Sequence, residues 1–433
     1  MQNAARVTAP NPQRGLLANA AAPRILASAG ERRLFALLTI CTLFEGFDTK
    51  LASLVLPVIG KEFGAGTDAL ARALSASSLG MPFAFFLMRL ADRVGRRPVF
   101  LASVAGYAVL TLATAFAPSL AAFTWLQLFA RLLMVTELSL AYLILSETLA
   151  PAARGRANGL LGAFASFGAS IPALLLAPLE DAGTGWRGLF ALGAVPLALF
   201  PLYWRGVRET PVFARAGIGA RTSLRDELAA MRTLARRGWR ARFVGVTALW
   251  VTVSFWSGTA LSFFVLFVFQ ERGWTAHDLQ WLTLGTIPAG FAGYGLAGWV
   301  MDRVGRRAAA VLYLVAGAAM TAVCFQSHER WVIAAGYWAL IGLGGVWTIA
   351  TTLTAELYPT ELRAAALGLT QHLLGRIGLI LGPLATGALA ARLGSTGDAV
   401  SWLALANLAC VPLVLALVPE TRGTDLSAVA DAR

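Results

Sequence analysis

The chain has 433 residues, of which 57% are hydrophobic and only 14% are charged, and its formal net charge is +13. A soluble domain carries about 25% charged residues, so this composition excludes an ordinary soluble protein and indicates a membrane protein. The basic residues stand in short clusters between apolar runs, which favours the topology signal of a membrane protein over a nucleic-acid-binding surface.

Apolar runs follow one another along almost the whole chain. A membrane-spanning helix needs about 20 apolar residues, and tilt and kinks absorb some variation in length. The sequence therefore predicts an all-α membrane protein with twelve transmembrane helices. The runs are Leu34–Val58, Leu70–Leu90, Val99–Phe116, Leu120–Leu145, Asn158–Leu176, Trp186–Trp204, Phe243–Phe269, Leu279–Val300, Ala308–Phe325, Trp331–Leu353, Ala364–Leu389 and Val400–Val418.

The runs fall into two halves of six, residues 34–205 and residues 243–418, joined by a basic linker at 206–242. Residues 1–33 are rich in Ala, Pro and Arg and hold no sustained apolar core. They predict a disordered cytoplasmic tail and not a cleaved signal peptide. Residues 419–433 form a second polar tail.

Arginines set the orientation. The connections Asp92–Pro98, Pro151–Arg156 and Asp302–Arg307 are strongly basic, and ten arginines lie from Arg205 to Arg242. With twelve crossings all of these lie on one side, which is the cytoplasm by the positive-inside rule. We expect a protein of the cell (inner) membrane with both termini in the cytoplasm. Within the linker, Ser223–Arg237 has helical spacing, so it is either an amphipathic helix on anionic lipid or a solvated charged segment.

The first run contains charges where lipid would exclude them. Glu45, Asp48 and Lys50 lie inside it, and a charge at mid-membrane costs a few kcal/mol and marks a functional site by default. Glu45 and Asp48 are three residues apart and share a helix face. Burial and mutual repulsion favour a proton on at least one of them. Lys50 either snorkels outward or turns inward if the helix unwinds at Gly46.

The two halves are an internal repeat. DRVGRR begins at Asp92 and again at Asp302, an offset of 210 residues. ETLAPAAR, from Glu147 to Arg154, returns as ELYPTELR, from Glu356 to Arg363, at an offset of 209. Repeated halves with a substrate bound between them are typical of transporters that work by alternating access.

At these residues the chain resembles the major facilitator superfamily, over nearly all of Leu34 to Leu426. The family motif G-x-x-x-D-R-x-G-R-R is complete from Gly298, whereas Met88 takes the leading position in the first copy. ELYPTELR, RETPVF and PETRGTDL are similar to sequences of the sugar porter, organic ion and metabolite/proton symporter branches. The stretch from Gly46 to Gly64 resembles the first helix of aromatic acid/proton symporters, with Glu45 in place of an aspartate. The fifth run lacks the G-P-x-x-G-G pattern of drug/proton antiporters, which disfavours export.

The resemblance implies a cytoplasmic charge network that holds one conformation and breaks in the other. The alternative is that these residues only set topology, to which acidic residues contribute little. The network would comprise Asp92, Arg96, Glu147 and Arg154, with Asp302, Arg306, Glu356 and Arg363 as its second copy.

Further candidates line the predicted substrate path. Arg376 falls midway through the eleventh run, and its planar guanidinium suits a substrate carboxylate. His372, one turn earlier, either relays protons or bonds a backbone carbonyl. Arg131 either binds substrate or pairs with an acidic neighbour, and Glu137 matches a glutamate of the proton route in the relatives. Aromatic residues that either wall the pocket or serve packing are Phe44, Phe47, Phe255, Trp256 and Trp347.

These features predict a transporter that imports a small organic anion, an aromatic or other carboxylic acid, by proton symport. A proton-coupled carrier of sugar or a cationic metabolite is one alternative, and a non-transporting receptor on the same scaffold is another. The sequence holds no nucleophile–base constellation, metal cluster or phosphate-binding loop, so we expect no enzyme, no metal and no cofactor besides the coupling proton. The expected partners are the substrate and the lipid bilayer, with no nucleic acid, and the expected state is a monomer.

Overall fold

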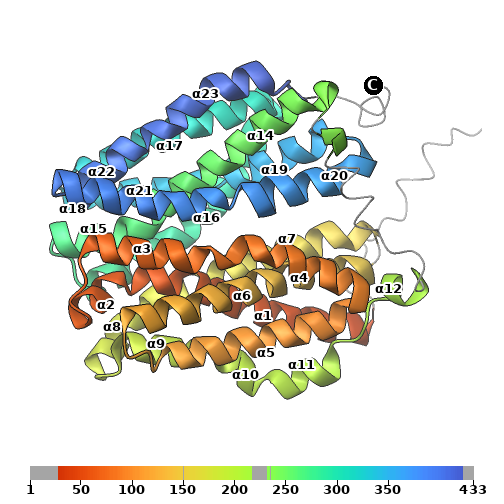
Figure 1. The fold of residues 1–433 in the computed structure, drawn as a ribbon, viewed down its shortest axis with the longest axis horizontal. Coiled ribbons are helices and arrows are strands. Elements are labelled where there is room, and N and C mark those ends of the chain that lie inside the picture. The colour runs from red at the N-terminus through yellow and green to blue at the C-terminus, as the bar shows by residue number, and fades with distance from the viewer. Residues whose placement is uncertain (1–27, 150, 217–231, 235, 423–433) are drawn as a thin grey trace, which may run out of the picture.

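The protein folds as a stack of helices that run side by side, with no strand in the part of the chain that is described. The computed structural model describes residues 28–149, 151–216, 232–234 and 236–422. In Figure 1 the N-terminal half, red to yellow-green, lies below the C-terminal half, green to blue. The predicted tails lie largely outside the described residues, as does most of the predicted amphipathic segment Ser223–Arg237.

The N-terminal half contains helices that correspond to the first six predicted runs. Several runs are divided into shorter helices by prolines or by short turns. The helices are α1 (Ala29–Leu54), α2 (Leu56–Glu62), α3 (Thr67–Ser78), α4 (Gly80–Val94), α5 (Arg96–Thr114), α6 (Leu120–Thr148), α7 (Pro151–Gly168), α8 (Ile171–Asp181), α9 (Gly185–Gly193), α10 (Val195–Ala198) and α11 (Phe200–Gly206).

The C-terminal half repeats this arrangement and contains two π-helical segments, η1 and η2, in the seventh and eleventh runs. The linker before this half contains α12 (Pro211–Ala216). The helices are α14 (Arg237–Trp256), η1 (Ser257–Leu261), α15 (Ser262–Glu271), α16 (Ala276–Val304), α17 (Arg306–Gln326), α18 (Arg330–Leu343), α19 (Val346–Leu357), α20 (Thr360–Leu367), η2 (Gly368–Leu374), α21 (Ile377–Leu393), α22 (Thr396–Leu403) and α23 (Leu405–Leu417).

The helices extend past the apolar runs at the ends that carry basic residues. α1 begins at Ala29, inside the stretch predicted as tail, because Ser28 and Glu31 form a capping box. α14 begins at Arg237, inside the predicted linker, and α7 begins at Pro151, before the predicted fifth run. Apolar runs mark only the part of a helix that lies in hydrocarbon, so polar extensions escape a prediction based on them.

Ten helical segments of the described chain are long and apolar enough to cross a membrane. α1 is not one of them, because every 18-residue window within it holds at least three charged residues. They come from Glu31, Arg32 and Arg33 near its start and from Glu45, Asp48 and Lys50 near its end. α16 is missing for another reason, since its many glycines and aromatic residues lower its mean hydropathy. Both helices lie among the others in the stack, so the twelve predicted runs all correspond to helical rods (Figure 1).

The two copies of DRVGRR form matching turns. Gly95 joins α4 to α5 with φ of 114°, and Gly305 joins α16 to α17 with φ of 100°. Residues that carry a Cβ rarely adopt such backbone angles, so the motif requires glycine there. We call the end of the stack that carries these two turns the basic end. It lies on the right of Figure 1, where α12 and α20 also lie.

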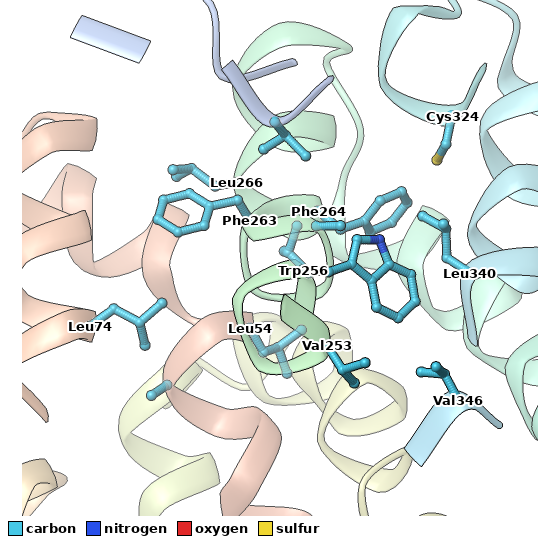
Figure 2. Packing of buried hydrophobic residues seen from close by; sticks show 14 of the residues in the cluster. Leu54, Leu74, Val253, Trp256, Phe263, Phe264, Leu266, Cys324, Leu340 and Val346 are labelled. Atoms are coloured by element: carbon cyan, nitrogen blue, oxygen red, sulfur yellow. The ribbon is translucent and has the colours of Figure 1, made fainter. Parts of the chain in front are cut away.

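Two clusters of buried apolar side chains stabilise the stack. The first cluster includes side chains from both halves, such as Leu54 and Leu74 from one and Phe263 and Leu266 from the other. Figure 2 shows these residues around α15. The second cluster is confined to the N-terminal half, where α1, α5, α6 and α11 meet. The shared cluster joins the halves, and the separate one makes the N-terminal half a packed unit of its own.

Candidate functional site

The two carboxylates of α1 point in different directions. Glu45 is 6% exposed, accepts a hydrogen bond from Thr49 Oγ1 at 2.9 Å and interacts electrostatically with Arg376 of the other half. Asp48 is 8% exposed and turns into the N-terminal half, where its Oδ2 accepts from Thr111 Oγ1 at 3.3 Å. Their spacing places them about 60° apart around the helix. We call the contact region between the two halves the seam. The two carboxylates, which were predicted to share a face, are therefore divided between the seam and the interior of the N-terminal half.

Glu137 is a third carboxylate inside the N-terminal half. Its side chain, on α6, is fully buried, and neither oxygen has a hydrogen-bond partner within ordinary hydrogen-bond distance. The thiol of Cys41 on α1 is the polar group that lies against it. Within the described chain no group of three or more His, Cys, Asp or Glu side chains converges as metal ligands would. Asp48 and Glu137 therefore lie in the apolar interior of the N-terminal half and Glu45 lies at the seam, and the three acids form no common ligand set.

Arg376 lies where the eleventh rod is broken. The π-helical η2 ends at Leu374 and α21 begins at Ile377, so Arg376 lies in the turn between them. Its guanidinium lies 5.9 Å from the centre of the Trp347 ring, and its Nε is buried without a hydrogen-bond partner. A discontinuous helix at mid-membrane is a frequent feature of substrate sites in transporters. Arg376, Trp347 and Glu45 thus bring together a cation, an aromatic face and a carboxylate from both halves.

The other predicted cations have different surroundings. His372 on η2 is half-buried and interacts electrostatically with Arg376, which agrees with the predicted common face. Arg131 is 7% exposed and donates from Nη1 to Ser78 Oγ at 2.8 Å, so its partner is a hydroxyl and not an acid. Lys50 is half-buried, and none of the described acidic side chains lies within ion-pair distance of it.

The predicted aromatic residues separate into two groups. Trp347 lies beside Arg376, and the half-buried Phe44 contacts Phe47 with ring centres 6.2 Å apart. Phe47 is 2% exposed within the cluster that joins the halves. Trp256 is 3% exposed and donates from Nε1 to Thr321 Oγ1 at 2.9 Å, inside the C-terminal half. Phe47 and Trp256 are therefore packing residues in this structure, because neighbouring helices already cover them.

Polar contacts between the halves lie at the end opposite the basic end. Thr67 Oγ1 donates to Gln270 Oε1 at 3.3 Å, and Gln280 Nε2 donates to the Leu174 carbonyl oxygen at 2.8 Å. His277 lies 3.6 Å from Asp181 there. Nearer the middle, Ser75 Oγ donates to the Ile380 carbonyl oxygen at 2.7 Å, and α3 packs on α21. The seam is thus held together on the side away from DRVGRR.

The predicted charge networks form at the basic end, once in each half. Arg96 Nη2 lies 3.2 Å from both Asp92 Oδ1 and Glu147 Oε1. Arg306 lies 3.1 Å from Glu356 Oε2, and its second contact, to the exposed Asp302, is longer at 3.6 Å. The arginine of the first copy thus bridges two acids closely, whereas that of the second relies mainly on one.

The last predicted arginine of each network takes a different partner. Arg154 Nε donates to the Leu149 carbonyl oxygen at 2.9 Å, and Arg363 Nε donates to the Ala355 carbonyl oxygen at 2.7 Å. Both therefore bond backbone carbonyls at the ends of the preceding helices, α6 and α19. Their prediction as partners of the acids needs this correction. Helix C-terminal carbonyls lack partners within their own helix and attract cations.

A third acidic pair completes the networks and was not predicted. Glu209 accepts from the backbone N–H groups of Arg96 and Arg97 at 3.0 and 3.1 Å. Glu420 accepts from those of Arg306 and Arg307 at 2.7 and 3.1 Å. Each glutamate therefore binds the N-terminus of the helix that follows DRVG, where the helix dipole favours an anion.

The residue after each glutamate ties it to the network. Thr210 Oγ1 donates to Glu147 Oε2, and Thr421 Oγ1 donates to Glu356 Oε2, both at 2.5 Å. The sequence signal was available, because Glu-Thr occurs at 209–210 and again at 420–421, close to the offset of the other repeats. Each half therefore fastens the chain that leaves its sixth helix to its own basic turn.

Comparison with known proteins gives the same family as the sequence motifs. The family model described as Major Facilitator Superfamily matches residues 38–383 and 247–430. A Bacillus subtilis (strain 168) protein named as a niacin/nicotinamide transporter, NiaP, is 28% identical over 406 residues, which cover 92% of this chain and 98% of that protein. The gallate transporter of Pseudomonas putida is 27% identical over 390 residues, covering 81% and 84%.

A solved structure supports the fold independently. The inward open conformation of the xylose transporter XylE from E. coli matches with a TM-score of 0.73 and 15% identity, covering 93% of this chain and 99% of that one. At this identity the match bears on the fold alone. The helical arrangement described above is therefore the fold of that solved structure.

Proposed function

Because the chain belongs to the major facilitator superfamily, as a multi-pass membrane transporter and not an enzyme, we propose that it imports a small aromatic or other carboxylic acid together with protons. The proposal places it in the cell membrane with both termini in the cytoplasm, since the basic end then faces the cytoplasm. Two relatives support this substrate class, because gallate and niacin are aromatic carboxylic acids, although the name of the Bacillus protein also includes nicotinamide, the neutral amide of niacin.

The observation that carries the substrate class is the position of Arg376. A guanidinium held in the seam between two halves, beside the face of Trp347 and with a buried Nε that lacks a partner, is suited to a carboxylate attached to a flat ring. The guanidinium would bind the carboxylate through two hydrogen bonds, and the indole would stack on the ring. A sugar would need no such cation, which is why we favour an anion.

The carboxylate Glu45 supplies a means of coupling. In the absence of substrate its charge interacts with Arg376 across the seam. A substrate carboxylate would compete for the same guanidinium, and protonation of Glu45 removes the competitor. Asp48 and Glu137, buried without a cation partner in the described chain, would hold or pass the proton. Proton and anion then favour each other's binding, as symport requires.

The contacts between the halves support a conformation open toward the basic end. The hydrogen bonds of Thr67 with Gln270 and of Gln280 with Leu174 lie at the opposite end. Alternating access would break these contacts and bring the basic ends of the halves together. We propose that the charge networks around Arg96 and Arg306 take part in that step.

The test compares a carboxylate with its neutral analogue. Nicotinate and nicotinamide share a ring and differ only in the carboxylate, so binding of both to purified protein isolates the role of the charge. We expect Arg376→Ala to weaken nicotinate binding by about 10- to 100-fold, the loss of a charge-assisted hydrogen bond, with little change for nicotinamide. Arg187→Ala, at an exposed ion pair with Glu62, is the matched control and should change neither.

Equal loss of both ligands would identify Arg376 as a structural residue and contradict the proposal. Binding without transport of nicotinate into liposomes would instead favour a receptor on the transporter scaffold.

A further inference from the structure

Four unpartnered oxygen atoms, of one carboxyl group and two hydroxyl groups, lie in the interior of the N-terminal half, away from the seam. Both oxygens of Glu137 and the hydroxyls of Tyr107 and Tyr203 are buried without a hydrogen-bond partner, and all three residues have no exposed surface. The buried thiol of Cys41 lies against Glu137 and Tyr203 as a weak sulfur partner, outside ordinary hydrogen-bond geometry. The four side chains come from α1, α5, α6 and α11 and lie within the apolar cluster of this half.

Such a cluster is costly unless something satisfies it. Leaving a buried hydroxyl or carboxyl group without a partner costs about 1–3 kcal/mol for each group. Glu137 does not face Arg376, and the two tyrosines do not line the seam, so substrate binding does not explain them. Ordered water is the usual partner of buried polar groups that protein atoms leave unsatisfied.

The C-terminal half provides an internal comparison. The repeat offsets of 210, 209 and 211 residues place Gly317, Val346 and Val414 at the positions of Tyr107, Glu137 and Tyr203. All three are buried, and the indole of Trp256 lies near Gly317, within 3.7 Å of where a Cβ would be. The nearest atom to that position is Nδ2 of the buried Asn407, at 3.1 Å, so this half holds a polar group of its own there. The three equivalent positions themselves carry no hydroxyl or carboxyl group, so the fold does not require Tyr107, Glu137 and Tyr203.

We propose that Cys41, Tyr107, Glu137 and Tyr203 enclose ordered water that carries protons between the acids of α1 and the basic end, by a route separate from that of the substrate. The inference rests on the proposed proton symport. Tyr107 interacts electrostatically with Asp48, Glu137 and Cys41, which joins the pocket to the acid on α1. Tyr203 lies three residues before the end of α11 at Gly206, so the polar groups continue toward the basic end.

The transfer needs only protons and O–H bonds. A protonated Asp48 or Glu137 gives its proton to a water, and each later water accepts one proton and releases another. The hydroxyls of Tyr107 and Tyr203 orient these waters and end each transfer unchanged, so they are positioning residues. The titratable groups that face the pocket are Cys41 and Asp48 from α1, Tyr107 from α5, Glu137 from α6 and Tyr203 from α11. Glu45 and Tyr142 interact with Glu137 from the side of the seam.

Cys41 allows the water to be tested without transport. The S–H stretch in infrared spectra reports exchange with D₂O, and the three cysteines are all buried and free. We compare a variant that keeps only Cys41 with one that keeps only Cys324, whose thiol is buried in the other half and donates to the Ile333 carbonyl oxygen at 3.5 Å. A hydrated pocket predicts exchange at Cys41 at least about tenfold faster, because isotope exchange requires contact with water. Equal or slower exchange at Cys41 would overturn the proposal.

Tyrosine substitutions test the route itself. Tyr107→Phe and Tyr203→Phe remove only a hydroxyl, and Tyr313→Phe removes an equally unpartnered buried hydroxyl from the C-terminal half as a control. We expect the first two to slow substrate-driven proton entry into liposomes by about 3- to 10-fold while leaving counterflow exchange and substrate affinity unchanged. Tyr313→Phe should slow neither.

The readouts separate this inference from the proposed function. Wild-type protein that moves substrate without protons would overturn the symport itself. If the wild type is a symporter and both tyrosine variants take up protons at its rate, only the separate proton route is overturned. The same holds if the variants lose counterflow exchange in parallel with proton entry, because that would indicate a structural role of the tyrosines.

Discussion

Asp48 is the residue at which proton coupling can be separated from substrate movement. Its Oδ2 accepts a hydrogen bond from Thr111, which asparagine can also accept, so Asp48→Asn should preserve the packing of α1 against α5. The variant cannot take up a proton at this position. We expect it to lose proton-driven accumulation while retaining counterflow exchange, both measured in liposomes. Asp68→Asn, at an exposed pair with Arg72, is the control and should retain both activities. Undiminished accumulation in Asp48→Asn would remove it from the mechanism.

Glu420 links stability at the basic end to pH. Partial burial alone would raise the pKa of Glu420, but the backbone N–H groups of Arg306, Arg422 and Thr421 outweigh it and hold the pKa below the usual glutamate value. The pKa of Glu420 is lower in the folded protein than in the unfolded chain, where it is about 4.3. The stabilisation that Glu420 contributes is therefore complete above the unfolded pKa and disappears as the pH falls through the folded pKa.

Glu420→Gln should therefore lower the free energy of unfolding at about pH 7 by about 1 kcal/mol once solvent screening is included, and by less near about pH 3. The melting temperature should fall accordingly. The measurement is thermal unfolding in detergent across this range. Glu329→Gln, at an exposed glutamate in the connection between α17 and α18, should leave the melting temperature unchanged. An equal melting temperature of wild type and Glu420→Gln at neutral pH would show that the contact stabilises nothing.

At the scale of elements, the turn between α16 and α17 depends on glycine for two reasons. Gly305 has φ of 100° and ψ of 163°, and a Cβ there would lie 2.5 Å from Glu420 Oε2. Gly305→Ala should cost about 1–3 kcal/mol, the range for side chains held in such backbone regions. Gly298→Ala in the same motif is the control, because a Cβ there has no atom within 4 Å. Similar melting temperatures for the two variants would contradict this explanation of the motif.

The elements were largely predictable from sequence, because lipid imposes long apolar runs that composition reveals directly. The ends of α1, α7 and α14 were not, since their first turns are polar and depend on local caps such as Ser28. The breaks at η1 and η2 were also missed. A π-helical segment changes the hydrogen-bond pattern without changing hydrophobicity, so the apolar pattern continues through it.

The candidate site was predictable in its residues but not in its directions. The sequence singled out Glu45, Asp48 and Arg376 as charges inside apolar runs, and a charge in such a run is a strong signal. It did not reveal that Asp48 turns toward α5 while Glu45 turns toward the seam, because that depends on how α1 is packed. Trp256 shows the reverse case, in which packing alone explains an aromatic residue.

At the scale of the whole molecule, transport requires the seam opposite the basic end to open. Thr67→Cys and Gln270→Cys, at side chains that meet across it, can be joined by a short bis-methanethiosulfonate cross-linker, whose disulfide bonds to the protein are broken by reduction. We expect the cross-linked protein to bind nicotinate but to transport none, and reduction to restore transport. Thr67→Cys alone should be insensitive to the reagent, because the native cysteines are buried. Full transport by the cross-linked protein would show that this end does not move.

The account as a whole depends on protons and a carboxylate crossing together. The most direct measurement is the pH inside liposomes that contain the purified protein and a trapped pH-sensitive dye. Nicotinate or gallate is added outside, with no imposed pH gradient or membrane potential. The account predicts that the interior acidifies with wild-type protein and does not with Asp48→Asn. Entry of the acid with no change of internal pH, or equal acidification by Asp48→Asn, would contradict it.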